Sequence, residues 1–240
     1  MTKSILLAIV FLALLGATVP SRADQTKTDA VDRLNSAAKS LREIVAAPDK
    51  GIPREVLSGA KCIAIVPSML KGGFIVGAKH GRGVSTCRLP NKNWSAPAFF
   101  TISGGSWGAQ IGVEDVQLVM MIMNDDGMRH LVQDKFQIGG EASGAAGPVG
   151  RHASAGTDWK IETQMLTYSR SHGLFAGFDL EGSWIEHDKD STQALYGRDY
   201  TNTQLFNGEV TMPAAARPFI SEVRKAKQRE ETKKHGAKAS

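Results

Sequence analysis

Apolar residues recur along the chain with two different periods, and the change of period separates helical from extended parts. From Thr28 to Ala47 the apolar positions recur every three or four residues, which predicts an amphipathic helix that stops at Pro48. A second, short helix is predicted from Pro53 to about Ala60, because proline fits the first turn of a helix. Both predicted helices precede the extended part of the chain.

After Ala60 the period shortens, and brief apolar or alternating runs follow one another. Glycine, proline and asparagine separate these runs at intervals of about ten residues, which is typical of antiparallel strands. The chain has no regular succession of strand, long helix and strand, which argues against a doubly wound nucleotide-binding fold. The predicted strands are KCIAIVPSM, GGFIVGAK, GVSTCRL, APAFFTIS, WGAQIGV and VQLVMMIM.

The C-terminal half continues with fewer strands and more helices. We expect a short helix near Met128 to Gln133, strands that begin near Thr157 and Gly173, and a helix from Asp190 to Tyr196. A last helix places four apolar side chains on one side: Phe219, Ile220, Val223 and Ala226. The predicted fold class is therefore α+β, with mainly antiparallel strands in a barrel-like or sandwich core and flanking N- and C-terminal helices.

The first 23 residues have the composition of a secretory signal peptide. Lys3 precedes an apolar run from Ile5 to about Val19, and small residues follow up to a predicted cleavage after Ala23. The first cysteine is Cys62, so we expect no lipid anchor on an N-terminal cysteine. We predict a signal peptide over residues 1–23, a single domain over 24–223 and a basic tail over 224–240, in a periplasmic or secreted protein.

Charge is unevenly distributed along the chain, and this affects which partners are expected. The formal net charge is +5, but residues 224–240 hold seven Lys or Arg and only two Glu. The rest of the predicted mature chain is slightly acidic, so we expect no nucleic-acid partner. The basic tail has two interpretations: adsorption to an anionic membrane, where each Lys or Arg contributes about 1 kcal/mol, or a disordered, soluble tail.

Two cysteines leave two interpretations open. In an oxidising compartment Cys62 and Cys87 would be expected to form a disulfide. The alternative is a pair of small, buried thiols, because spacing along the chain does not determine whether the two Cα atoms come close enough for a bridge.

One short motif raises the alternative of an enzyme. Residues 104–108 read GGSWG and match the G-x-S-x-G pattern of a serine esterase or lipase, with Ser106 as the nucleophile. That motif requires a strand before the serine and a helix after it, whereas the sequence after Ser106 continues with a strand-like pattern. The six histidines lack metal-binding spacing. We therefore expect no enzyme activity, no metal and no cofactor.

Glycines and cations indicate candidate anion sites. Residues 136–151 read FQIGGEASGAAGPVGR, which matches neither the Rossmann fingerprint nor the P-loop. This segment has two interpretations: close packing of backbone, or a headgroup contact made by Arg151 and His152. Lys79 and Arg82 are expected at the tip of a hairpin, where they would be presented to a phosphate-rich surface. Two further candidates flank a later strand, Lys160 and Arg170.

Five blocks of the chain form a more specific pattern between Leu57 and Phe206. They read LSGAKCIAIVPSMLKGGFIVGAKHGRGV, WSAPAFF, SGGSWGAQIGVEDVQLVMMIMNDDG, KFQIGGEASGAAGPVGR and YSRSHGLFAGFDLEGSWI, the last followed by ALYG. In order and spacing these blocks resemble the SYLF domain family, which occurs in SH3-containing actin-patch proteins, in FYVE-containing proteins and as single exported domains of bacteria.

The resemblance implies a lipid-binding module without enzyme activity. Members of the family bind phosphoinositides and other anionic lipids, so we expect anionic phospholipids or a membrane surface in the cell envelope as the partner. Eukaryotic relatives also bind actin, which we do not expect of an exported chain without an SH3 or FYVE sequence. A scaffold for envelope proteins is the remaining alternative, and nothing in the sequence indicates an oligomeric state.

Overall fold

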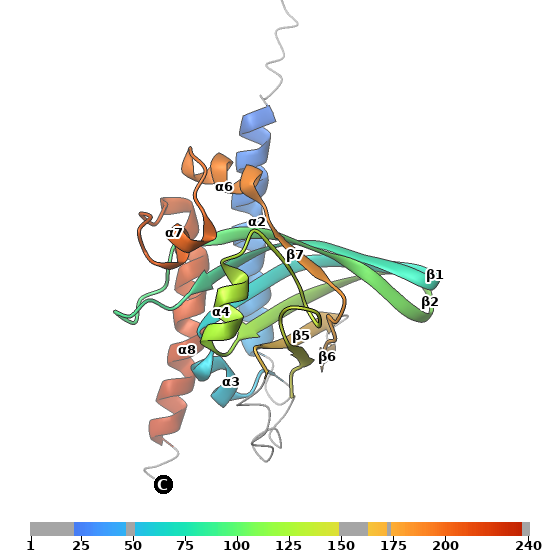
Figure 1. Ribbon diagram of the computed structural model, residues 1–240. Helices are drawn as coiled ribbons and strands as arrows, with labels where there is room; N and C mark the ends of the chain where they lie inside the picture. The colour runs from blue at the N-terminus through green and yellow to red at the C-terminus, as the bar shows by residue number, and fades with distance from the viewer. Residues whose placement is uncertain (1–21, 47–50, 149–162, 172–173, 237–240) are drawn as a thin grey trace, which may run out of the picture.

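The computed structural model describes residues 22–46, 51–148, 163–171 and 174–236 (Figure 1). The helices are α2 (Arg22–Ala46), α3 (Arg54–Gly59), α4 (Asp125–Leu131), α6 (Lys189–Tyr196), α7 (Asn202–Phe206), the 3-10 helix η2 (Ala214–Ala216) and α8 (Arg217–Gly236). The strands are β1 (Cys62–Cys87), β2 (Ala98–Ile122), β3 (Lys135–Gln137), β4 (Gly144–Ala146), β5 (Met165–Ser171), β6 (Leu174–Gly177) and β7 (Trp184–His187).

All seven strands belong to one sheet. The strand order is β3-β7-β2-β5-β4, with β1 paired to β2 and β6 paired to β5. Every pair is antiparallel except β4 and β5, and the sheet curls into a half-barrel with helices beside it (Figure 1). The predicted α+β class with mainly antiparallel strands and flanking helices is confirmed.

Two very long strands form the centre of this sheet, where the sequence predicts six short ones. β1 and β2 pair from Cys62 and Ile122 to Ser85 and Ala98, with register shifts near Pro67 and after Gly73. The prediction of separate strands is wrong because these prolines and glycines mark irregularities within a continuous ladder, where bulges tolerate them. β2 continues this ribbon into the body, where its first half pairs with β7 and its second half with β5.

The β1–β2 ribbon doubles back, so that the two ends of β1 meet. Cys62 and Cys87 are joined by a disulfide, which settles the choice that the sequence leaves open. Glycine makes the crossing of the two halves possible. A Cβ on Gly83 would lie 2.8 Å from the backbone oxygen of Ile65 and 2.3 Å from the Phe100 ring. The glycines of this stretch therefore permit close approach of backbone and do not form a turn.

Alternate side chains of the ribbon enter two different cores. On β2, Val119 and Met121 pack with α2 and α8, whereas Leu118 and Met120 face the interior of the half-barrel. This is the period of two that a strand with both faces buried requires. We refer to these two sides as the helix face and the inner face of the sheet.

The helices cover the helix face with the stripes that the sequence predicts. Leu34, Leu41 and Ile44 of α2 are fully buried, as are Phe219 and Val223 of α8. The predicted N-terminal and C-terminal helices are therefore confirmed. Helix α8 continues to Gly236, so most of the predicted basic tail is helical. Within the described residues, no helix combines the length and the apolar character that a membrane crossing requires.

The smaller elements agree with the predictions less evenly. The predicted short helices correspond to α3, α4 and α6, and α6 begins at the N-cap Asp188, whose side chain accepts a hydrogen bond from the backbone N of Ser191. The strand predicted to begin near Gly173 is instead two strands, β6 and β7, because a turn at Gly182 with a φ of 75° separates them.

Candidate functional site

The sequence predicts six headgroup-binding side chains, and the structure describes three of them. Lys79 and Arg82 lie in β1, and Arg170 lies in β5. Because Lys79 and Arg82 are three positions apart in a strand, they point to opposite faces of the sheet. The remaining three lie outside the described residues: Arg151, His152 and Lys160.

The structure also changes the local setting of the first two cations. Residues 79–82 pair with residues 101–104 of β2 in the middle of the ribbon. The prediction that Lys79 and Arg82 form a hairpin tip is therefore wrong, because the ladder continues through the glycines on either side.

Arg82 is bound to an acidic side chain of the protein. Its Nη2 lies 3.0 Å from Oδ2 of Asp188, and Nη1 of Arg33 lies 2.8 Å from the same oxygen. Oγ of Ser191 also donates to this oxygen at 2.8 Å. Burial acts to raise the pKa of Asp188, but the hydrogen bonds from Arg33 and Ser191 outweigh it and lower the pKa to about 2. This cluster joins α2, β1 and the start of α6.

Arg170 is also held inside the protein. Its Nη1 donates to Oε2 of Glu43 at 2.6 Å, and the Nε2 of Gln117 donates to the same oxygen at 3.1 Å. The pKa of Glu43 is lowered, first by the hydrogen bond from Gln117 and then by the charge of Arg170. The three side chains tie the end of α2 to β2 and β5, so Arg170 has a structural role here.

Lys79 differs from both arginines because it is buried without an acidic partner. The residue is 6% exposed and faces the inner side of the sheet. Within the described part of the chain, no carboxylate lies within ion-pair distance of its ammonium. Burial lowers the pKa of Lys79, a shift that Asp179 opposes and Lys71 reinforces. A buried cation whose pKa is shifted by burial is a candidate functional residue.

The far end of the ribbon has a distinct surface, and we call residues 72–78 and 104–113 the ribbon end. These residues include no Asp, Glu, Lys or Arg. β7 pairs with β2 only as far as Ser103, and β5 pairs with it only from Gln117, so among the described strands the ribbon end has two strands and no third. Figure 1 shows it reaching beyond α2, away from the helices.

Exposed apolar side chains accompany the ribbon end. Val113 is 78% exposed, and Leu70, just outside the ribbon end, is 52% exposed. Leu70 pairs with Asp115 and Gly72 with Val113, so the two apolar side chains lie on the same face. Large exposed apolar residues on a protruding ribbon are typical of an interaction surface. The lack of charge in this sequence is the signal that could have identified it.

The glycine segment is packed closely where the structure describes it. A Cβ on Gly147 would lie 2.1 Å from Cζ of Tyr168, and one on Gly144 would lie 2.6 Å from a methyl group of Ile138. Close approach of backbone is therefore the role of these two glycines. Arg151 and His152, on which the headgroup interpretation depends, lie outside the described residues.

The alternative enzyme site lacks the local structure that it requires. Ser106 pairs with Gly77 inside β2, which continues as a strand to Ile122. A nucleophile elbow is a sharp turn from a strand into a helix. The described residues also contain no group of three or more His, Cys, Asp or Glu side chains placed to hold a metal ion.

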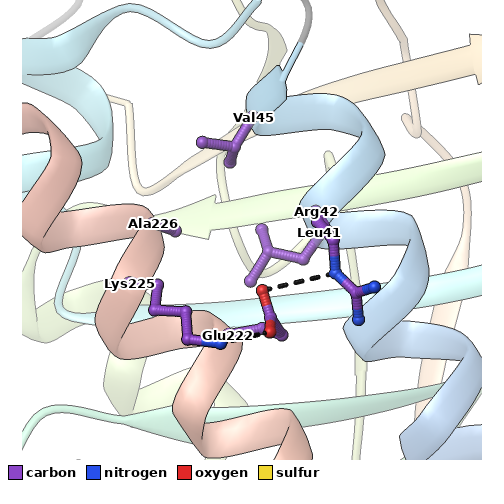
Figure 2. Close-up of a pocket in the computed structure, with 6 residues that line it drawn as sticks. All are labelled: Leu41, Arg42, Val45, Glu222, Lys225 and Ala226. Atoms are coloured by element: carbon purple, nitrogen blue, oxygen red, sulfur yellow. Dashed lines mark hydrogen bonds and ion pairs between the residues drawn. The ribbon is translucent and has the colours of Figure 1, made fainter.

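A small groove between α2 and α8 is occupied by paired charges. Figure 2 shows Glu222 between Arg42 and Lys225, at 3.5 Å from Nε of Arg42 and 2.9 Å from Nζ of Lys225. The hydrogen bond from Lys225 is the main cause that lowers the pKa of Glu222. The contact with Arg42 joins the two helices, whereas the contact with Lys225 lies within α8.

Comparisons with known proteins agree with the fold and the five sequence blocks. A family model described as Ysc84, Las17-binding protein actin regulator, matches residues 103–226, just over half of the chain. The SH3 domain-containing YSC84-like protein 1 of Bos taurus is 36% identical over 186 residues, which cover 75% of this chain and 54% of that protein. The Homo sapiens protein of the same name shows the same identity and coverage.

A yeast relative extends the comparison. Protein YSC84 of Saccharomyces cerevisiae is 34% identical over 192 residues, which cover 77% of this chain and 41% of that protein. The chain thus spans about half, or somewhat less, of the length of these curated relatives. Together, the family match and these relatives show that the chain belongs to the Ysc84 family, the SYLF domain family that its sequence blocks resemble.

Proposed function

We propose that this protein binds anionic lipid at a membrane surface and performs no chemistry on it. The observation that carries the proposal is the ribbon end, an uncharged two-stranded projection beside the exposed side chains of Leu70 and Val113. Lys71 and Lys79 flank this segment on β1, and Glu114 and Asp115 follow it on β2. The apolar end matches the apolar interior of a bilayer, and the two lysines can meet its anionic headgroups.

The magnitudes of the two contributions indicate that both are needed. Burying the exposed parts of Leu70 and Val113 in lipid contributes about 3 kcal/mol in total. Each lysine near an anionic surface adds about 1 kcal/mol. A millimolar Kd corresponds to about 4 kcal/mol, so neither contribution alone reaches millimolar affinity, whereas the two together, about 5 kcal/mol, exceed it. We therefore expect binding that requires anionic lipid and weakens with salt.

The predicted signal peptide supports a location of this activity in the periplasm or outside the cell. The disulfide between Cys62 and Cys87 supports that placement, because disulfides persist in oxidising compartments. The expected ligands there are phospholipids of the cell envelope. The family resemblance implies phosphoinositides as further ligands.

Vesicle co-sedimentation tests the proposal. We expect the protein to sediment with phosphatidylcholine vesicles that contain phosphatidylglycerol, and to remain in solution with phosphatidylcholine alone or at high salt. Val113→Asp should abolish the interaction, because it places a negative charge on the surface that enters the membrane. Thr203→Asp adds the same charge on the exposed surface of α7 and serves as the matched control.

The same experiment distinguishes the alternatives. Equal sedimentation with neutral and anionic vesicles, or unchanged binding by Val113→Asp, contradicts the proposal. Co-sedimentation with actin filaments but not with vesicles would favour a protein-interaction module, in line with the description of the family as an actin regulator. Labelling of Ser106 by a fluorophosphonate would favour the esterase alternative.

A further inference from the structure

The buried residue Lys79 lacks the kind of partner that Arg33, another strongly buried cation, has. Arg33 is 7% exposed and donates to Asp188 at 2.8 Å. Lys79 is buried to the same degree, yet within the described residues it has no carboxylate at ion-pair distance. Buried charges are normally paired, because removing an ion from water is costly unless an opposite charge or hydrogen bonds replace the solvent.

A second buried polar group lies in the same row of the sheet. Lys79 pairs with Gly104, and Ser103 pairs with Trp184, so Ser183 lies beside Gly104 on the other side. Ser183 is fully buried, and its Oγ has no hydrogen-bond partner within the described part of the chain. A lysine and a serine, both with unused donors, thus flank one glycine on the inner face of the sheet.

Gly104 allows these two side chains to approach each other. A Cβ at this position would lie 3.0 Å from Cε of Lys79 and 3.1 Å from both Cα and Oγ of Ser183, so only glycine fits between them without a shift. The backbone there is held by the pairing to β1 and by the bond from the N of Ser183 to the carbonyl oxygen of Leu180 at 2.9 Å. Gly104 itself is half-buried, whereas Oγ of Ser183 is fully buried.

Other charges lie near this pair of residues. Lys71 lies on the same face, with its Nζ 5.4 Å from the centre of the Phe178 ring, and directly opposite Glu114 in the ladder. The charge of Asp179 raises the pKa of Lys79 more than the charge of Lys71 lowers it, but burial outweighs both. Lys79 thus has charges near it but no carboxylate at ion-pair distance within the described residues.

We propose that Lys79 and Ser183 form a binding site for a phosphate group over Gly104. The ammonium donates charge-assisted hydrogen bonds, and the hydroxyl adds one donor. This inference rests on the proposed function for its physiological ligand, the phosphate of a lipid headgroup. The location fits that ligand, because the site lies where the ribbon end joins the body and would meet the headgroup layer as the ribbon end enters the bilayer.

The test is an NMR titration of the full chain with two sources of phosphate. Inorganic phosphate is one, and phosphatidylcholine vesicles that contain phosphatidic acid are the other. We expect the amide signals of Gly104 and Ser183 to shift with inorganic phosphate and to broaden with the vesicles. Lys79→Met should weaken both responses by about tenfold or more, and Ser183→Ala by several-fold, as expected when a charge-assisted or a neutral hydrogen bond is lost.

A matched variant and a stability measurement keep the result interpretable. Lys225→Met removes one positive charge from an exposed site on α8, and we expect it to leave both titrations unchanged. We expect Lys79→Met to unfold at a temperature equal to or above that of the unmodified protein, because an apolar side chain replaces an unpaired buried charge. A structural lysine would give the opposite result, so a marked fall in the Tm overturns the proposal.

The outcomes separate this site from the proposed function. If the vesicles bind but Lys79→Met responds like the unmodified protein, the phosphate site is wrong and lipid binding stands. If only inorganic phosphate binds, in a manner that depends on Lys79, the site stands and its ligand is a soluble phosphate. If neither source of phosphate binds, both proposals fail.

Discussion

The two halves of the β1–β2 ribbon belong to the same strands but have opposite surroundings. The half inside the body is bordered by β5 and β7, covered by α2 and α8, and joined across its ends by the disulfide. The ribbon end has no third strand among the described residues and no charged residue. Packing and the disulfide stabilise the first half. The second half can therefore carry exposed apolar side chains.

The buried cations of the two regions differ in the same way. In the body, Arg33 and Arg82 share Asp188 as a partner. At the root of the ribbon end, Lys79 is buried without one. Functional sites often contain residues that lower the stability of the folded protein. The contrast between Arg33 and Lys79 is therefore the basis of the phosphate site that we propose.

The largest expected effect on stability comes from the disulfide of the body. Replacing Cys62 and Cys87 by Ala should lower the free energy of unfolding by about 3 kcal/mol, because the bridge closes a segment with a sequence separation of 25 residues. Urea unfolding followed by circular dichroism measures the difference. A reducing agent should destabilise the unmodified protein to the level of the double variant and leave that variant unchanged. Equal stability of all samples would contradict the prediction.

The crossing of the two halves should be almost as sensitive. Gly83→Ala places a methyl group against the Phe100 ring and the backbone oxygen of Ile65, and we expect a loss of about 3 kcal/mol from this overpacking. Gly105→Ala is the matched control, because its nearest atom would be 4.0 Å away. Thermal unfolding of the two variants should therefore differ by several degrees. Similar melting temperatures would show that the crossing can relax.

The charged cluster of the body predicts a loss of stability in acid. The pKa of Asp188 is about 2 in the folded protein and close to 4 in an unfolded chain. Its contribution is therefore complete above about pH 4 and is lost as the pH falls toward about 2, a change on the order of 2 kcal/mol. Urea midpoints at several pH values measure this slope. Asp188→Asn should be less stable at neutral pH and should show a smaller acid dependence.

The smallest effect is expected at the ribbon end. Val113→Thr should change the free energy of unfolding by less than about 0.5 kcal/mol, since the side chain is mostly exposed. Val119→Thr is the matched variant on the same strand and face, where the side chain is fully buried. We expect it to cost about 2 kcal/mol, because a hydroxyl would enter the apolar core. Equal effects in a urea titration would remove the distinction between the two halves.

Much of the fold was predictable because it follows from local patterns. The three-and-four spacing of α2 and the alternation along β1 and β2 are visible in the sequence and correspond to the buried residues. The continuity of the ribbon was not predictable, because Gly81 and Gly83 have the composition of a turn. Whether a glycine makes a turn or permits a close contact depends on a partner elsewhere in the chain, here Ile65 and Met69.

The candidate site was predictable only in part, for the same reason. Arg82 is a plausible headgroup ligand until the fold brings Asp188 to it from 106 residues away. Lys79 was predicted as an exposed cation and is instead buried. Ser183 carries no signal of its own, since only the register of β1, β2 and β7 places it next to Gly104. Chemistry that depends on neighbouring strands is not visible in the residues of one strand.

The bridge between Cys62 and Cys87 has a mechanical consequence for the ribbon. It turns the whole of β1, including the part that lies in the ribbon end, into a covalently closed ring. A force on the ribbon end cannot separate the two ends of β1 from each other, because a covalent bond joins them.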